Sequence, residues 1–346
     1  MKNRFPKIVK ITLISVYIIF LAGAIVRMTG SGMGCPDWPK CFGYYIPPTE
    51  EAEITWQPNS SYKKGMIIVK DEALFVAEKD LETEETFIAS HWKAYTKHDY
   101  ASFNKYHTWT EYINRLTSVL SGIAFLVLMF SAVTYYKRIN KNKWIIILPA
   151  VGLILMGVQA VLGKIVVDTN LKPEIITIHM IVGLVIIALL LKLHFLVSTR
   201  KKIFKYNSVF NKLLIISVIF SLIQIAMGTQ VRQFIDEQVK LYGFENKNYS
   251  LMNPSFKFYF HRSFTIAIVL VNFGLFYINQ IKKLDYKLVN WIIFLLFLET
   301  ITGMLMYYAE FPIGTQATHL FAGALLFGVQ FYLWLQSRKA VENQNN

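Results

Sequence analysis

The segment WIIILPAVGLILMGVQAVLGKI, residues 144–165, decides the fold. Its one charged residue is Lys164, and as a helix it is long enough to cross about 30 Å of hydrocarbon, which takes roughly 20 residues. Seven further stretches are also long and apolar enough to cross the membrane, and they lie near residues 8–28, 112–136, 174–197, 209–229, 256–281, 287–307 and 314–336. Hydrophobic residues make up 54% of the 346-residue chain, more than one soluble core can bury. We therefore predict an all-α membrane protein with eight transmembrane helices.

The basic residues, which give a net charge of +14, follow the ends of these spans rather than forming a patch for nucleic acid. They lie before the first span, in every second connection and after the last span: Lys2, Arg4, Lys7, Lys10, Lys137, Arg138, Lys141, Lys143, Arg200, Lys201, Lys202, Lys205, Lys282, Lys283, Lys287, Arg338 and Lys339. Lys and Arg accumulate in cytoplasmic connections of membrane proteins. We therefore predict a multi-pass protein of the cytoplasmic membrane with both termini cytoplasmic, surrounded by lipid and not bound to nucleic acid.

The first connection, about residues 29–111, is predicted to lie outside. It is a polar segment of about 80 residues with many Glu and Asp, too long for a simple turn. We expect a small, partly ordered cap over the outer ends of the helices.

Both cysteines of the chain, Cys35 and Cys41, lie at the start of this segment in GMGCPDWPKC, residues 32–41. On the oxidising side of the membrane such a close pair can form a disulfide. Two interpretations remain: a bond that staples the loop, or a redox-active pair.

Three sets of landmarks recur in the same order in the two halves of the chain. GAIVR (residues 23–27) matches GTQVR (228–232), and YINR (112–115) matches YFHR (259–262). With spacings of four, sixteen and four residues, Gln159, Gly163, His179 and Gly183 match Glu299, Gly303, His319 and Gly323. An even number of spans per repeat makes the halves enter the membrane in the same sense. We predict two four-helix bundles, residues 1–205 and 206–346, related by an axis along the membrane normal.

Four polar side chains are predicted at one depth near the outer ends of their helices: Asn114, His179, His261 and His319. A polar group in the membrane is costly unless it is paired, solvated or ligated. His261 and His319 come from parallel-running helices of one bundle, where two imidazoles can bind a heme iron from opposite faces. The alternative is that each histidine hydrogen-bonds to a neighbouring helix or to interfacial water.

Four arginines, Arg27, Arg115, Arg232 and Arg262, lie at the same outer level. Guanidinium groups suit carboxylates such as heme propionates, although reaching out to lipid phosphate explains them equally well. Glu111 precedes the YINR landmark, and Phe258 stands at its counterpart in the second half. A carboxylate present in one half is a candidate general base or stabiliser of positive charge, or an acid favoured by the helix dipole. Glu299 is expected to pair with an arginine or another polar neighbour.

At these residues the chain resembles the heme A synthase family, which converts heme O to heme A for cytochrome oxidases. The resemblance covers nearly all of residues 8–336, apart from much of the segment between about 45 and 107. Its most specific parts are residues 23–41, EYINR at 111–115, and the segments around His179, His261 and His319.

The resemblance implies an oxidoreductase that oxidises a ring methyl of substrate heme O, through hydroxylated intermediates, to the formyl group of heme A. It implies heme b held by His261 and His319, substrate heme near His179, and Glu111 as the catalytic residue. The pair Cys35 and Cys41 resembles the outer-loop cysteines of family members that carry them.

The chain departs from the family at one position, because the family has Glu-x-x-His where this chain has Glu111 and Asn114. Asparagine is a poor ligand for heme iron. Three interpretations remain: His179 binds alone and leaves an open coordination position, His107 folds back to supply the second ligand, or turnover is altered.

The competing function is a b-type membrane cytochrome that moves electrons from quinol, which explains His261 and His319 but gives Glu111 no task. A transporter built from repeats would have helices broken near the bilayer midplane instead. In a heme A synthase of a bacterial cytoplasmic membrane, the pathway order makes heme O synthase, the protoheme farnesyltransferase, the expected partner. A quinone is a candidate electron acceptor, and a homo-oligomer is a candidate assembly.

Overall fold

Eight helices in the described part of the chain are long and apolar enough to cross a membrane, as predicted. The computed structural model describes residues 4–96, 103–169, 171–198, 204–242 and 254–342. The helices are α1 (Arg4–Met28), α2 (Lys105–Arg138), α3 (Trp144–Asp168), α4 (Pro173–Val197), α5 (Ser208–Tyr242), α6 (Phe256–Ile281), α7 (Leu288–Tyr308) and α8 (Thr315–Glu342). The protein is therefore an integral membrane protein whose spanning part is entirely helical.

α2 and α5 extend furthest beyond the spans predicted from hydropathy. α2 begins at Lys105 rather than near residue 112. The Asn104 side chain caps this helix start by accepting hydrogen bonds from the backbone amides of Tyr106 and His107. α5 continues to Tyr242 rather than ending near 229. Hydropathy marks only the hydrocarbon crossing, and a helix can continue past it. Glu111 therefore lies inside α2 rather than immediately before it.

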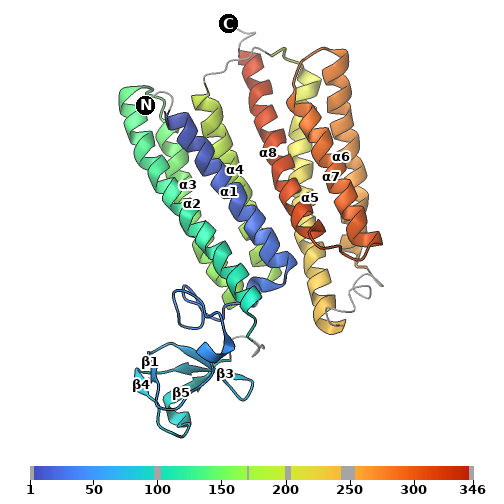
Figure 1. Cartoon of the computed structure of the whole chain (residues 1–346). Helices are drawn as coiled ribbons and strands as arrows, with labels where there is room; N and C mark the ends of the chain where they lie inside the picture. The colour runs from blue at the N-terminus through green and yellow to red at the C-terminus, as the bar shows by residue number, and fades with distance from the viewer. Residues whose placement is uncertain (1–3, 97–102, 170, 199–203, 243–253, 343–346) are drawn as a thin grey trace.

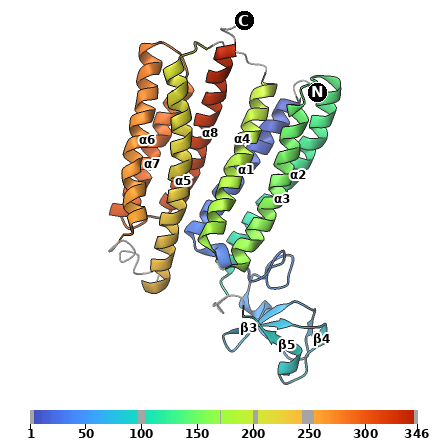
Figure 2. The ribbon, with the colours of Figure 1, turned by 180° about the vertical axis from the view of Figure 1, so that it is seen from behind.

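The helices form two groups of four that lie side by side (Figures 1 and 2). In the first group α1 packs on α2 and α4, and α3 packs on the same two helices; in the second, α5 and α7 both pack on α6 and α8. Contacts of α8 with α1 and α4, and of α4 with α5, join the groups. The internal duplication, its axis and the division at residue 205 stay predictions.

The second group contains a chain of buried polar side chains between its helices. Ser217 of α5 donates to Oδ1 of Asn272 in α6 (2.8 Å), which also accepts from Gln330 of α8 (3.2 Å). Ser221 of α5 donates to Gln330 Oε1 (2.7 Å). Lipid tails are as apolar as leucine, so hydrogen bonds of this kind, rather than apolar burial alone, fix how membrane helices meet.

The outer segment between α1 and α2 folds into a small β domain, which is more ordered than the cap we expected. α1 gives way to a turn at Gly30, whose φ of 70° is in the left-handed region that favours glycine. An antiparallel sheet then forms in the order β2 (Ile67–Lys70), β3 (Ala73–Ala77), β5 (Trp92–Ala94), and β1 (Ser61–Tyr62) pairs with β4 (Leu81–Glu82). Its own hydrophobic core includes Phe42, Ile54 and Ile67. The domain lies beyond the helix ends of the first group (Figure 1).

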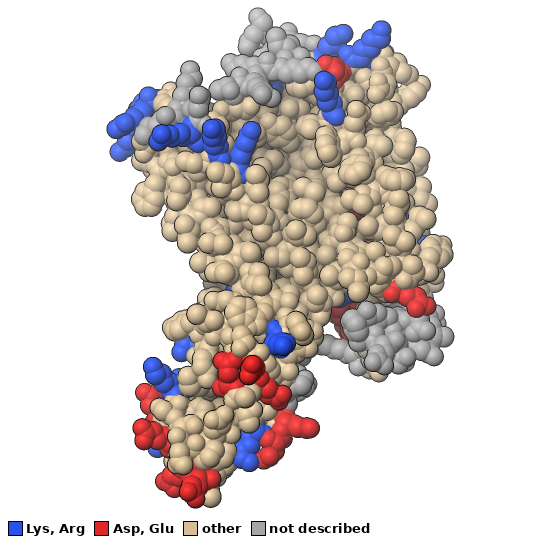
Figure 3. Space-filling view, in the orientation of Figure 1, with Lys and Arg blue, Asp and Glu red and all other residues tan. Residues whose placement is uncertain are grey.

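The two ends of the molecule differ in charge. Acidic side chains gather on the β domain, where Lys and Arg also occur, whereas mostly Lys and Arg gather at the opposite end of the helices (Figure 3). α1 begins and α8 ends at that basic end (Figure 1). Four of the basic residues used to predict the topology lie outside the described residues: Lys2, Arg200, Lys201 and Lys202.

Candidate functional site

Each of the four polar side chains predicted at one depth faces a glycine on a neighbouring helix. A Cβ added to Gly23 would lie 3.9 Å from Asn114 Oδ1, and one added to Gly163 would lie 3.9 Å from His179 Cε1. In the second group, Gly228 and Gly303 are the partners of His261 (3.1 Å) and His319 (3.6 Å). These glycines are the landmarks of the sequence repeat. Their missing side chains give the polar groups room between the helices.

The structure brings His261 and His319 together. Their ring centroids are 6.4 Å apart, and the ring planes are inclined by 71°. An imidazole nitrogen binds a transition metal at about 2 Å and lies roughly 1 Å from its ring centre, so two imidazoles on one metal have centres about 6 Å apart. Nδ1 of His261 is buried and has no hydrogen-bond partner among the described residues. The separation and the glycine at each ring fit the two axial ligands of a heme.

The first group has a different pair at the corresponding positions. Asn114 Oδ1 and His179 Nδ1 are both buried without a hydrogen-bond partner in the described part of the chain. Gln159 of α3 donates to the backbone carbonyl of His179 (2.9 Å), not to its ring. His107 lies in the first turn of α2. Because α2 is continuous, His107 is about 10 Å from Asn114 along the helix axis and does not fold back to its level.

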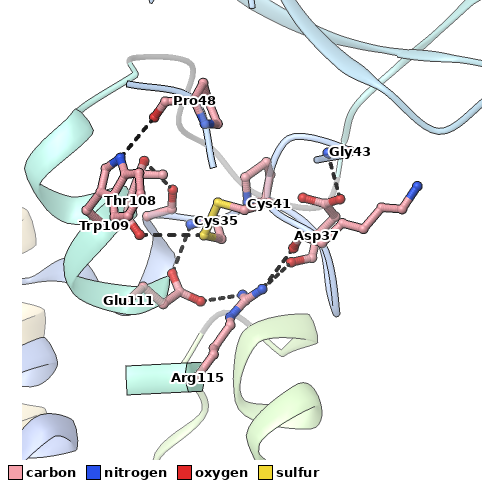
Figure 4. The surroundings of a disulfide bond; sticks show 12 residues. Cys35, Asp37, Cys41, Gly43, Pro48, Thr108, Trp109, Glu111 and Arg115 are labelled. Carbon is pink, nitrogen blue, oxygen red and sulfur yellow. Dashed lines mark hydrogen bonds and ion pairs between the residues drawn. A yellow bond between two sulfur atoms is a disulfide. The ribbon is translucent and has the colours of Figure 1, made fainter. Parts of the chain in front are cut away.

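Glu111 is buried at the outer end of α2, with 3% of its surface exposed. Its Oε2 accepts a hydrogen bond from the backbone N–H of Cys35 (2.9 Å), and its Oε1 forms an ion pair with Arg115 one turn along the same helix (Figure 4). Thr108, one turn before it, donates to the carbonyl of Gly34 (2.8 Å). The candidate catalytic carboxylate is therefore held against the start of the outer segment.

The predicted disulfide joins Cys35 to Cys41. The loop that it closes supplies two carbonyl acceptors, those of Asp37 (2.8 Å) and Lys40 (2.9 Å), to Nη1 of Arg115. Arg115 thus connects the loop to Glu111 (Figure 4), a role that the sequence did not indicate. The bond itself is present, and both interpretations of the pair, loop staple and redox-active pair, stay open.

The other three arginines have different surroundings. Asp236 of α5 forms ion pairs with both Arg27 (3.3 Å) and Arg232 (2.8 Å), and Arg232 also donates to the backbone carbonyl of Arg27 (3.0 Å). The two arginines are counterparts in the repeat, so this cluster joins the two groups of helices. Arg262 lies over the ring of Tyr259, with its guanidinium carbon 5.4 Å from the centroid. Binding of heme propionates by these arginines stays a prediction.

Glu299 pairs with a histidine. Its Oε2 lies 3.0 Å from Nδ1 of His319. The sequence predicted a polar neighbour but did not identify His319 as that neighbour. Glu299 is thus a member of the candidate site that the sequence reasoning undervalued.

These features define a class: a multi-pass membrane protein with facing imidazoles in one helix bundle and a buried carboxylate at the mouth of the other. The chain belongs to the COX15-CtaA family of cytochrome oxidase assembly proteins, which it matches over residues 7–78 and 75–331. The family predicted from the motifs is thereby confirmed.

Curated relatives extend over nearly the whole chain. It is 24% identical to the heme A synthase of Shewanella oneidensis over 380 aligned positions, which cover 95% of this chain and 97% of that protein. It is 23% identical to the heme A synthase of Listeria welshimeri, with 96% and 95% covered.

Proposed function

We propose that the chain is a heme A synthase that oxidises a ring methyl group of heme O to the formyl group of heme A for cytochrome oxidase assembly. The observation that carries this proposal is Glu111, a buried carboxylate at the mouth of the first group, held by Arg115 and the disulfide loop. The relatives are named heme A synthases, which supports synthesis of heme A as the function. The competing b-type cytochrome explains His261 and His319 but assigns no task to Glu111.

In this proposal the two groups of helices have different tasks. His261 and His319 would hold heme b, which supplies electron transfer when bound. His179 would hold the substrate heme, and Asn114, which stands where the second half has His261, supplies no second imidazole there. The four arginines at the outer level are proposed to bind propionate groups.

Glu111 is proposed as the proton acceptor of the reaction. With water as the source of the formyl oxygen and a quinone as the electron acceptor, oxidation of a methyl group to a formyl group releases four protons and four electrons, and a carboxylate beside that carbon can accept a proton. Arg115 and the Cys35 amide fix the direction of the carboxylate oxygens, which a proton transfer requires. The same two contacts keep the side chain from turning outward to water.

The setting proposed for the enzyme is the cytoplasmic membrane of a bacterium, with both termini in the cytoplasm and the β domain outside. The basic end of the molecule supports this orientation. Because its substrate dissolves poorly in water, we propose transfer of heme O by contact with heme O synthase. A quinone is the proposed electron acceptor.

The test is co-expression with a heme O synthase in a host that lacks heme A, followed by extraction and chromatography of the hemes. Heme A or its hydroxylated precursor is expected with the wild-type chain and not with Glu111→Ala. Glu174→Ala, at an exposed acid near the outer end of α4, is the matched control and should retain activity. Extracts with only heme B and heme O, from a protein that binds heme b, would instead establish the b-type cytochrome.

A further inference from the structure

Nδ1 of His319 has two polar side chains around it. The Glu299 carboxylate lies at 3.0 Å and the Thr302 hydroxyl at 3.0 Å, both from α7. The Thr302 hydroxyl lies 2.7 Å from the carbonyl of Leu298, to which it donates, so its oxygen is available as an acceptor. With two acceptors, Nδ1 carries the proton, and Nε2 is the basic nitrogen of the ring.

Placing Glu299 at this depth of the membrane costs free energy. It lies within a membrane-spanning helix, its side chain is 17% exposed, and its Oε1 has no hydrogen-bond partner among the described residues. Gly323 makes room for the carboxylate, since a Cβ there would lie 3.5 Å from Oε1. An ionisable group in the membrane is rarely retained without a function, and the partner of this one is His319.

The first group lacks both the carboxylate and the hydroxyl. At the positions that correspond in the repeat, Gln159 replaces Glu299 and Leu162 replaces Thr302. Gln159 bonds to the backbone of His179, and the ring Nδ1 of His179 is buried without a partner in the described residues. The two histidines therefore occupy matching places but differ in what supports their rings.

We infer that Glu299 and Thr302 are positioning residues that make His319 a strong, permanent axial ligand, whereas Gln159 and Leu162 leave His179 a weak ligand for a heme that must depart. A carboxylate that accepts from one ring nitrogen makes the other nitrogen a stronger donor. Stronger donation stabilises the oxidised iron and lowers the reduction potential. The inference rests on the proposed function, because it takes heme b to be held by His261 and His319.

The test compares the purified holoprotein with Glu299→Gln and Thr302→Leu, each of which copies the first group. The midpoint potential of the bound heme is measured by spectroelectrochemical titration, and the rate of heme loss is measured by transfer to apomyoglobin. Both variants should show a higher potential, and Glu299→Gln should lose heme about 10–100-fold faster, the usual effect of removing such a partner. The matched control is Glu310→Gln, an exposed acid just after α7, which should change neither quantity.

Unchanged potentials and unchanged rates of heme loss in both variants would overturn the inference. Should Glu299→Gln fail to accumulate, Thr302→Leu decides alone, because it leaves no buried charge unpaired. The reverse change, Gln159→Glu, should slow the loss of heme from the first group, and an unchanged rate there would refute the role given to Gln159. A wild-type chain with no heme spectrum would refute the proposed function itself, an outcome distinct from all of these.

Discussion

The backbone N–H of Cys35 donates to Oε2 of Glu111 at 2.9 Å, across 76 residues of sequence. This bond connects the closed loop between Cys35 and Cys41 to the candidate catalytic carboxylate, and Arg115 makes the same connection through the loop carbonyls. The outer loop is therefore part of the site.

Removal of the disulfide should impair the reaction. In the double variant Cys35→Ser, Cys41→Ser the loop is no longer closed, and the amide and carbonyls that hold Glu111 and Arg115 can move apart. A misplacement of about 1 Å can cost about 100-fold in rate, so we expect heme A in cell extracts to fall by about 10-fold or more. A yield equal to that of the wild type would show that the bond does not position Glu111.

Arg115→Met should destabilise the protein strongly, because it leaves Glu111 buried and unpaired. Loss of one partner of a buried ion pair costs about 3–5 kcal/mol, whereas an exposed pair contributes about 1 kcal/mol or less. The control is Lys164→Met, which breaks an exposed pair with Asp168 (2.7 Å) at the same i,i+4 spacing. Thermal unfolding in detergent measures both, and Glu111→Gln combined with Arg115→Met should recover part of the loss. Equal shifts in Arg115→Met and Lys164→Met would contradict the expectation.

Gly228→Ala should weaken heme binding. The added methyl group would lie 3.1 Å from Cε1 of His261, closer than ordinary contact, and would push the ring from its place. Gly157→Ala is the matched control, since no atom lies within 4 Å of a Cβ there. The measurement is the ratio of heme to protein absorbance after purification. A ratio equally low in both variants would point to a general effect on helices instead.

Asp236→Asn should loosen the junction of the two helix groups. Arg27 and Arg232 would keep their charges but lose their shared carboxylate, which is partly exposed, at an expected cost of about 1 kcal/mol in stability. The control is the neighbouring, exposed Glu237→Gln. The melting temperature in detergent reports the difference, and a melting temperature unchanged by Asp236→Asn would mean that the arginines find other partners.

The stability of the β domain should depend on Asp37. Burial raises the pKa of its carboxyl group, against the opposing effects of the Gly43 and Phe42 amides and the Arg115 charge. Because the pKa is higher in the folded chain than in the unfolded one, the folded chain binds the proton more tightly, and stability falls as pH rises from about 4 through the folded-state pKa. Asp37→Asn should flatten this part of the profile of melting temperature against pH. Asp71→Asn, at an exposed position, should leave it unchanged.

Much of the helical fold could be predicted because a helix that spans the bilayer needs a long apolar segment. Such segments, for example residues 144–165, are easily recognised in the sequence. The approach of His261 to His319 was predictable too, since the repeat placed both near the outer ends of parallel helices. The positions of the spans and of these two histidines could be inferred from the length of the apolar segments and from the sequence repeat.

Other features depend on contacts that no local pattern records. Asp236 meets Arg27 from 209 residues away, and nothing beside either residue indicates the partner. The strands of the outer segment have two to five residues, too few for alternation to stand out. The carbonyls that accept from Arg115 could not be predicted from the sequence, because every residue has a backbone carbonyl. Their orientation toward Arg115 depends on the fold of the closed loop.

The β domain has a hydrophobic core of its own, whereas the helices bury their apolar surface largely in lipid. The stability of the β domain therefore depends on water as the solvent, and that of the helices depends on lipid. A water-soluble denaturant acts first on the outer domain, and a change of lipid or detergent acts first on the helices. Unfolding should accordingly occur in two separate transitions, so that one free energy of unfolding does not describe this protein.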